Sequence, residues 1–201
     1  RFRGRLAASH REVNGHIENA TLSTDDPDRV EKMARAWLEF DVNDNLTVSL
    51  KAEIGEFDVD GRQIEIVNEL PVPGAPSPTN PFGGRTYSQI LAALGQDPSV
   101  LNNTADYVRS SNGDFSDNNT DEYVLQADWQ LGENTLTLIN SYSKYDFSEL
   151  CDCDFTGGNV FSVIMDEEFD QTSHEIRLTS PTGNKLEYIL GAYYETSDLE
   201  F

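Results

Sequence analysis

Apolar and polar side chains alternate with a period of two through several long stretches of the chain, which is the pattern of β-strands whose two faces differ. The clearest stretch is 169–195, where two alternating runs flank a Pro-Thr-Gly-Asn segment at 181–184. Proline, glycine and asparagine favour turns. We therefore predict a hairpin in which Ile176 and Leu190 share one face and Arg177 lies on the other.

The same alternation predicts five further strands, so that one leading strand is followed by three hairpins. Their connections alternate in length, because three are short turns and the three between them are much longer. The longest is an insert at 57–120, rich in Pro, Gly, Asn and Asp, with a short helix predicted over 87–94. The predicted strands lie at 1–13, 33–42, 46–56, 123–131, 135–147, 169–180 and 185–195.

The length of these strands favours a membrane barrel. A run of about ten residues exceeds the five or six usual in soluble sheets and matches what a tilted strand needs to cross a bilayer. Short turns at one end and long loops at the other are typical of outer-membrane barrels. The competing interpretation is a soluble antiparallel sandwich or meander, which alternates in the same way. Aromatic residues would form two girdles: Phe40 and Trp129 near the short turns, and Tyr123, Tyr142, Tyr193 and Tyr194 near the long loops.

The composition of the chain limits the classes of molecule that it is expected to bind. The formal net charge is −22, which disfavours nucleic acid and anionic lipid headgroups as direct partners. Hydrophobic residues make up 37% of the chain, which is low for a compact soluble core. No run of 18 apolar residues exists, so no transmembrane helix is predicted, and the first residues do not form a secretory signal. We expect the sequence to be a segment of a longer polypeptide.

Three segments resemble one family. HEIRLTSPTGNKLEYILGAYYE (174–195) is similar to a hairpin typical of TonB-dependent outer-membrane receptors, where a Gln/His-Glu-hydrophobic-Arg-hydrophobic strand meets a Trp/Tyr-x-hydrophobic-Gly-x-Tyr-Tyr strand. RGRLAASHREVNGHIEN (3–19) resembles an early barrel segment of that family, and TLTLINSYSKYDF (135–147) resembles another of its strands. The resemblance extends over most of the chain and leaves the insert at 57–120 unmatched.

The resemblance implies an all-β fold, in which 1–201 supplies about seven strands of one 22-stranded transmembrane β-barrel domain. It implies an N-terminal plug domain and a TonB box, neither of which is visible in this sequence. The short turns would be periplasmic, and the long loops, including 57–120, would be extracellular. Such a receptor resides in the bacterial outer membrane and imports a scarce siderophore-, cobalamin- or saccharide-like nutrient. Its expected partners are outer-membrane lipid, the nutrient and the TonB–ExbB–ExbD system.

Polar residues on the second parity of the strands would face the barrel lumen. Polar interiors are general in such barrels, so we expect these side chains mainly to pair across strands and to contact the plug. A ligand role is the minority interpretation for each of them. The set comprises Arg35, Glu39, Lys51, Glu53, Gln126, Asp128, Glu175, Arg177, Lys185 and Glu187.

The long loops carry the better ligand candidates. Their acidic segments at 114–119 and 152–154 offer oxygen ligands for a divalent cation, although no EF-hand register exists. Solvated acidic loops are the simpler explanation, so no metal site or other cofactor is assigned. Five loop aromatics are predicted to pack against an organic ligand: Tyr87, Tyr107, Phe115, Phe155 and Phe161.

No catalytic pattern is present, and we do not expect an enzyme. The sequence contains no nucleotide-binding glycine motif and no Ser-His-Asp order, and its carboxylates are too numerous to single out an acid–base pair. Cys151 and Cys153 alone do not complete a tetrahedral metal site. The second hypothesis is a soluble or surface-anchored, calcium-dependent adhesion module, suggested by the net charge and by the Asp- and Asn-rich loops.

Overall fold

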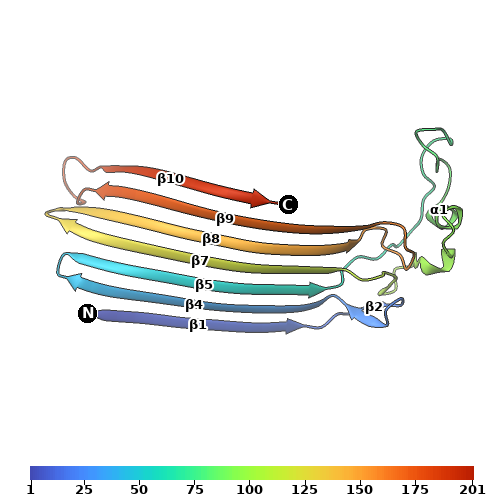
Figure 1. The fold of residues 1–201 in the computed structure, drawn as a ribbon, viewed down its shortest axis with the longest axis horizontal. Helices are drawn as coiled ribbons and strands as arrows, with labels where there is room; N and C mark the ends of the chain where they lie inside the picture. The colour runs from blue at the N-terminus through green and yellow to red at the C-terminus, as the bar shows by residue number, and fades with distance from the viewer.

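The computed structural model describes all residues, 1–201, and is dominated by one gently curved antiparallel sheet of seven long strands (Figure 1). Each strand pairs with the next one along the chain, in the order β1-β4-β5-β7-β8-β9-β10. The all-β, antiparallel part of the prediction is therefore confirmed. The strands are β1 (Phe2–Val13), β4 (Asp28–Asn43), β5 (Leu46–Asp60), β7 (Phe115–Leu131), β8 (Asn134–Asp152), β9 (Ser162–Thr179) and β10 (Ile189–Glu200).

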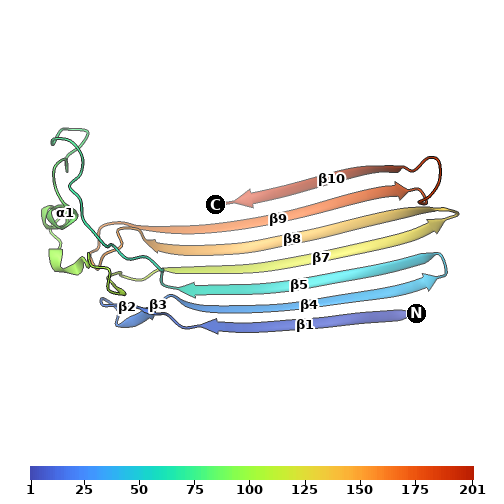
Figure 2. The ribbon, with the colours of Figure 1, turned by 180° about the vertical axis from the view of Figure 1, so that it is seen from behind.

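Tight turns gather at one end of the sheet, called here the turn end, and the long connections gather at the other, the loop end (Figures 1 and 2). Two residues, Gly132 and Glu133, separate β7 from β8, and Gly132 has a positive φ of 67°, which glycine adopts without a steric penalty. Several strands extend beyond their predicted ends toward the loop end. The insert expected at 57–120 is correspondingly shorter and occupies 61–114.

The third hairpin is the place where the predicted turn is wrong. Nine residues, 180–188, connect β9 to β10, rather than a tight turn at 181–184. Pairing stops after Ser180, whose N–H donates to the carbonyl of Tyr188 at 3.0 Å, because Pro181 has no N–H to continue the ladder. Lys185 and Glu187 therefore lie in the loop, where the Glu187 carboxylate accepts a hydrogen bond from the Gly183 N–H at 2.6 Å.

The sheet is one layer thick, and neither of its faces is covered by a second sheet or by a helix (Figures 1 and 2). Among hydrophobic residues only Ile17, Leu91 and Cys151 are buried. The apolar stripe of the strands is thus not packed inside a sandwich within this chain. The sheet is open, with β1 and β10 as unpaired edges, so no closed barrel is present in these 201 residues.

The loop end carries a small polar assembly built from three connections. It contains the three-stranded sheet β3-β2-β6, formed by Thr24–Asp26, Ile17–Asn19 and Val108–Arg109. The helix α1 (Tyr87–Ala93) and the short 3-10 helix η1 (Pro98–Val100) belong to the insert. No helix of the structure is long and apolar enough to cross a membrane.

Candidate functional site: the two faces of the sheet

The strand register sorts the side chains into two faces, because directly opposed residues project to the same side of a sheet. Face A includes the ladder row Phe40, Val48, Ala127, Leu138 and Ile176. Face B holds the residues of opposite parity. Each face changes character between the turn end and the loop end, so that the sheet has four distinct regions.

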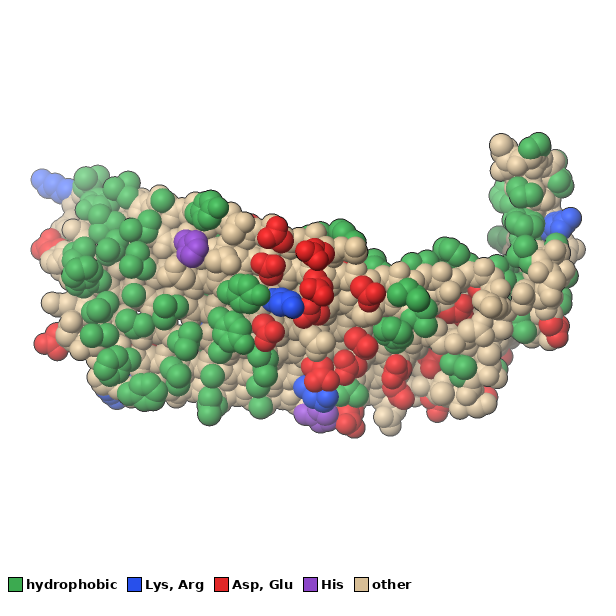
Figure 3. All heavy atoms as spheres, viewed as in Figure 1, with side chains coloured by type: hydrophobic (Ala, Val, Ile, Leu, Met, Phe, Trp, Pro, Cys, Tyr) green, Lys and Arg blue, Asp and Glu red, His purple; other side chains and the backbone are tan.

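On face A, the half nearest the turn end is an apolar band that crosses all seven strands, seen as the green region on the left of Figure 3. It is exposed, with Leu50 at 40%, Ile176 at 46% and Leu190 at 62%. Along β5 the band extends from Leu46 to Ile54, about 26 Å at the usual rise per residue. Its larger members are Phe2, Leu6, Leu38, Phe40, Val48, Leu50, Ile54, Tyr123, Leu125, Trp129, Leu136, Leu138, Tyr142, Ile176, Leu178, Leu190 and Tyr194.

On the same face, the half nearest the loop end is an acidic band, seen as the red cluster in the middle of Figure 3. Lys32 and Lys144 are the basic residues within it. They pair with Glu56 at 2.8 Å and with Asp146 at 2.9 Å. Its carboxylates include Glu12, Asp28, Glu56, Asp58, Asp60, Asp117, Asp121, Asp146, Asp166, Glu168, Asp170, Asp198 and Glu200.

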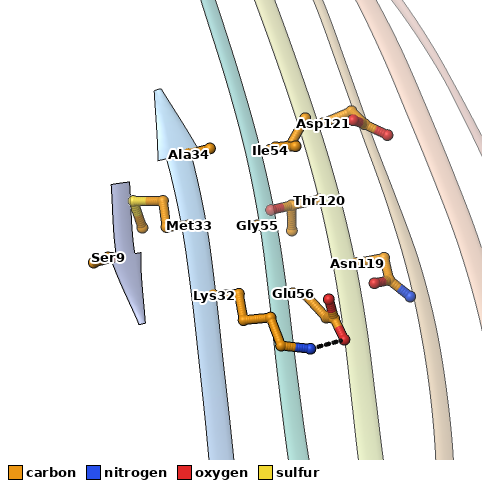
Figure 4. A pocket seen from close by; sticks show the side chains of 10 residues that line it. All are labelled: Ser9, Lys32, Met33, Ala34, Ile54, Gly55, Glu56, Asn119, Thr120 and Asp121. Atoms are coloured by element: carbon orange, nitrogen blue, oxygen red, sulfur yellow. Dashed lines mark hydrogen bonds and ion pairs between the residues drawn. The ribbon is translucent and has the colours of Figure 1, made fainter. Parts of the chain in front are cut away.

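A shallow hollow of about 410 Å³ lies beside Gly55, close to where the two bands meet, and is lined by residues of both parities from β1, β4, β5 and β7. Figure 4 shows Ala34 and Ile54 on its apolar side, and the Lys32 side chain extended toward Glu56 on its polar side. Gly55 contributes only backbone there. The hollow is thus a seam between two surfaces of different polarity and not an enclosed site.

This border runs obliquely across the hydrogen-bond ladder. On β5 the apolar band ends at Ile54, whose ladder row continues to Asp198 on β10. On β1 the band ends at Ala8, in the same ladder row as Ile54, and on β10 it ends at Tyr194, four residues before Asp198. With a rise of about 3.3 Å per residue and about 4.8 Å between strands, the border is inclined by about 25° to the ladder between β1 and β10.

The turn-end half of face B holds a lattice of cross-strand ion pairs. Arg35 donates two hydrogen bonds to Glu53, at 2.7 and 2.9 Å. Lys51 lies 3.2 Å from Glu53 and 2.5 Å from Glu122, so one chain of pairs links β4, β5 and β7. Eight residues predicted to share the inner face do share face B: Arg35, Glu39, Lys51, Glu53, Gln126, Asp128, Glu175 and Arg177.

Other members of that lattice behave similarly. Asp128 accepts hydrogen bonds from Thr137 and Gln126, each at 2.7 Å. Arg177 lies 3.4 Å from Glu175, and Glu39 pairs with Arg3. Over this half, face B therefore carries a network of ion pairs and hydrogen bonds, although the buried Nε of Arg3 has no partner. The placement of these residues toward a lumen stays a prediction.

The loop-end half of face B is aromatic, which sequence reasoning missed. Tyr145 on β8 and Phe169 on β9 are stacked, with ring centroids 5.2 Å apart and an interplanar angle of 21°. In the next ladder row Asn118 stands between Phe57 and Phe147. We call Phe57, Tyr145, Phe147 and Phe169 the aromatic patch. The parity of Phe57 and Phe147 is the available signal, but the alternation pattern places Phe57 at the start of the predicted insert and Phe147 at the end of a predicted strand.

A buried polar network holds the loop assembly together at the loop end. The Arg109 guanidinium donates to Asp114 at 2.6 Å and to the carbonyl of Arg62 at 2.7 Å, and it lies 3.4 Å from Asp26. Asp26 also accepts a hydrogen bond from Asn19 at 3.0 Å. These groups come from two different connections, 14–27 and 61–114, so the network, rather than an apolar core, fixes the two loops relative to each other.

The five aromatics predicted to bind a ligand do not gather in one place. Phe115 is not in a loop but is the first residue of β7, on face A. Tyr87 begins α1 and donates from its hydroxyl to the carbonyl of Asp154 at 2.5 Å. Tyr107 and Phe161 are 67% and 57% exposed, and Phe155 lies half-buried in 153–161. Of the girdle tyrosines, Tyr193 lies on face B, whereas Tyr194 is on face A.

The acidic loop segments do not form a cation site in this structure. No group of three or more His, Cys, Asp or Glu side chains is arranged to hold a metal ion. The Asp154 carboxylate instead accepts hydrogen bonds from Thr156, Val160 and Phe161, and Asp152 accepts one from the Asn112 N–H. Cys151 and Cys153 are joined in a disulfide.

Comparison with known proteins finds no family model, no curated protein and no solved structure that matches the chain.

Proposed function

We propose that the sheet is part of the wall of an outer-membrane β-barrel, in a TonB-dependent receptor that binds a scarce nutrient and imports it. Face A would be the outer surface of the barrel, and its apolar band would contact lipid. Face B would line the lumen. The turn end would be periplasmic and the loop end extracellular.

The observation that carries this proposal is the uncovered apolar band of face A. It crosses every strand of the sheet, and large exposed apolar surfaces mark contacts with membranes or with other proteins. Its extent of about 26 Å along β5 is close to the height of about 25 Å typical of the lipid-facing band of outer-membrane barrels. A second apolar layer on the protein itself would be expected for a soluble sandwich.

The oblique border of that band supports the same proposal. Strands of membrane barrels are tilted relative to the bilayer normal, so the membrane plane crosses the ladder rows at an angle. The border of the apolar band is likewise inclined, by about 25° to its own ladder. The aromatic residues Tyr123, Tyr142 and Tyr194 lie along this border, where interfacial aromatics are enriched.

The remaining regions fit that orientation. The ion pairs of face B supply a polar lumen. The two unpaired edges, β1 and β10, would be paired by further strands of the barrel, since open edges do not occur in the hydrocarbon region. Tyr107 and Phe161 are exposed at the loop end and stay candidates for first contact with the nutrient. The plug, TonB and ExbB–ExbD are partners that come with the family resemblance.

Fractionation of cell envelopes that contain the full-length protein tests the proposal. We expect recovery in the membrane pellet after washing with high salt and with carbonate, and release only by detergent. Recovery in the aqueous fraction would refute it. The competing calcium-dependent module predicts a large rise in unfolding temperature on calcium addition in detergent-free buffer, which calorimetry measures directly.

A further inference from the structure

The polarity of the sheet inverts between its two ends. Near the turn end, face A is apolar and face B carries ion pairs. Near the loop end, face A is acidic and face B carries the aromatic patch of Phe57, Tyr145, Phe147 and Phe169. The aromatic patch therefore has charged, hydrated residues behind it and does not belong to the lipid-facing surface. Its partner must lie on the side of face B.

The stacked pair Tyr145 and Phe169 walls a hollow of about 200 Å³. Two carboxylates and a hydroxyl group lie beside the rings, because the hollow is also lined by Glu53, Glu122 and Ser143. Flat apolar ring faces next to hydrogen-bonding groups match the surface of a sugar, which presents C–H groups on its faces and hydroxyls around its edge.

One polar atom of the same region lacks a partner. The side-chain carbonyl oxygen of Asn118 is buried and accepts no hydrogen bond. In the ladder this residue lies directly between Phe57 and Phe147. An unsatisfied buried acceptor is costly. This oxygen is closed to solvent, so a ligand hydroxyl would reach it only after the Asn118 side chain turns toward the aromatic patch.

The charge of the protein around the aromatic patch disfavours anionic ligands among those that have a flat apolar face. The cations nearest this hollow, Arg35 and Lys51, are already paired with Glu53 and Glu122. The acidic band behind the aromatic patch and the net charge of −22 repel anions further. Uncharged ligands avoid this penalty.

We propose that the aromatic patch is a binding surface for an uncharged oligosaccharide, with a sugar ring stacked on Tyr145 and Phe169. This inference rests on the proposed function, since it names the class of nutrient that the barrel would take up. Glu122, Ser143 and Asn118 would hydrogen-bond the sugar hydroxyls. The ligand would reach this surface after passing the loop assembly.

The test is calorimetric titration of the full-length protein in detergent with maltohexaose, cellohexaose and chitohexaose, and with an oligogalacturonate hexamer as the anionic counterpart. We expect one of the neutral hexasaccharides to bind at least about tenfold more tightly than the anionic one. Tyr145→Ala and Phe169→Ala are each expected to weaken that binding by about tenfold. Tyr145→Phe keeps the ring and is expected to bind within about threefold of the wild type.

Tyr142→Ala is the matched control, because Tyr142 lies on the same strand but on face A. It is expected to leave sugar binding unchanged. Absence of binding for all three neutral hexasaccharides, equal binding of the anionic hexamer, or wild-type binding by both alanine variants would overturn the inference. So would alanine variants that only lower the unfolding temperature. Envelope fractionation reads out the membrane location separately, so failure of this inference is distinguishable from failure of the proposed function.

Discussion

Arg109 and Asp114 form an ion pair of 2.6 Å in which the two side chains are only 2% and 1% exposed. The pair joins β6 to the residue just before β7, and the second carboxylate oxygen of Asp114 accepts a hydrogen bond from the Asp152 N–H at 2.7 Å. One buried carboxylate thus ties the long insert to the last residue of β8.

Removing one partner of this pair leaves the other charge buried without compensation. Asp114→Asn and Arg109→Met are each expected to destabilise the loop assembly by about 3 kcal/mol. Limited proteolysis within 61–114 is the measurement, with faster cleavage expected for both variants. The double variant is expected to cost less than the sum of the two.

Glu168→Gln is the control for this experiment. It removes an exposed carboxylate from the acidic band on face A and is expected to leave the cleavage rate unchanged. Equal cleavage rates for Asp114→Asn and Glu168→Gln would show that the buried pair does not hold the loops.

Because the two faces of the sheet differ, we expect an arginine to have different effects on stability at two adjacent residues of β5. Leu50 lies in the apolar band, whereas Ser49 lies on face B opposite Glu39 and Gln126. Leu50→Arg is expected to reduce stability in lipid vesicles by about 2–4 kcal/mol, since a charge would face the hydrocarbon. Ser49→Arg gains a carboxylate neighbour and is expected to change stability by less than about 1 kcal/mol.

Urea unfolding of the full-length protein in vesicles compares these two variants directly. Equal costs for Leu50→Arg and Ser49→Arg would contradict a lipid-facing face A. Greater damage from Ser49→Arg would indicate that face B is the packed side.

Tyr87 links the insert to the loop after β8 and gives the loop assembly a pH dependence at its alkaline end. Burial raises the pKa of Tyr87 to about 12, and the nearby carboxylates of Asp154 and Asp152 act in the same direction. An unfolded tyrosine titrates near pH 10. The stabilisation by the neutral hydroxyl is therefore complete below about pH 10 and is lost as pH rises from about 10 to about 12.

Difference absorbance of tyrosinate between the wild type and Tyr87→Phe isolates the titration of this residue. We expect a midpoint near pH 12, and we expect the stability advantage of the wild type over the variant to shrink between pH 10 and pH 12. A midpoint near pH 10 would show that the hydroxyl is solvated and does not donate to Asp154.

The alternation of side chains was sufficient to predict seven antiparallel strands, but not their full length. The pattern places residues 115–120 in the Pro-, Gly-, Asn- and Asp-rich insert and residues 162–168 in the connection after the fifth strand, and Asp, Asn and Glu within them are poor strand formers. In the structure they continue β7 and β9, because ladder pairing with neighbouring strands overrides that local preference. Phe115 was misplaced for this reason.

The buried network at the loop end was beyond prediction for a different reason. Asp26, Arg109 and Asp114 come from two connections and a strand boundary, and nothing in their local sequence indicates that they meet. The acidic segment at 114–119 was interpreted as one group of possible cation ligands. The structure separates it, because Asp114 turns into the network and Asp117 projects from face A.

The two tryptophans of this sequence provide a direct test of which face meets lipid. Trp129 lies in the apolar band of face A and is 48% exposed, whereas Trp37 lies on face B opposite Arg5 and Lys51. Trp129→Phe and Trp37→Phe each leave one of them in the full-length protein. In vesicles of lipid brominated along the acyl chain, contact quenching reports which indole touches hydrocarbon.

We expect the emission component lost in Trp129→Phe to be strongly quenched by brominated lipid, because that ring faces the bilayer in the proposed orientation. The component lost in Trp37→Phe should be insensitive to bromine. If Trp37 were the quenched residue, the charged side chains of face B would have to face hydrocarbon, where their transfer free energy is strongly unfavourable. The proposed orientation would then be wrong.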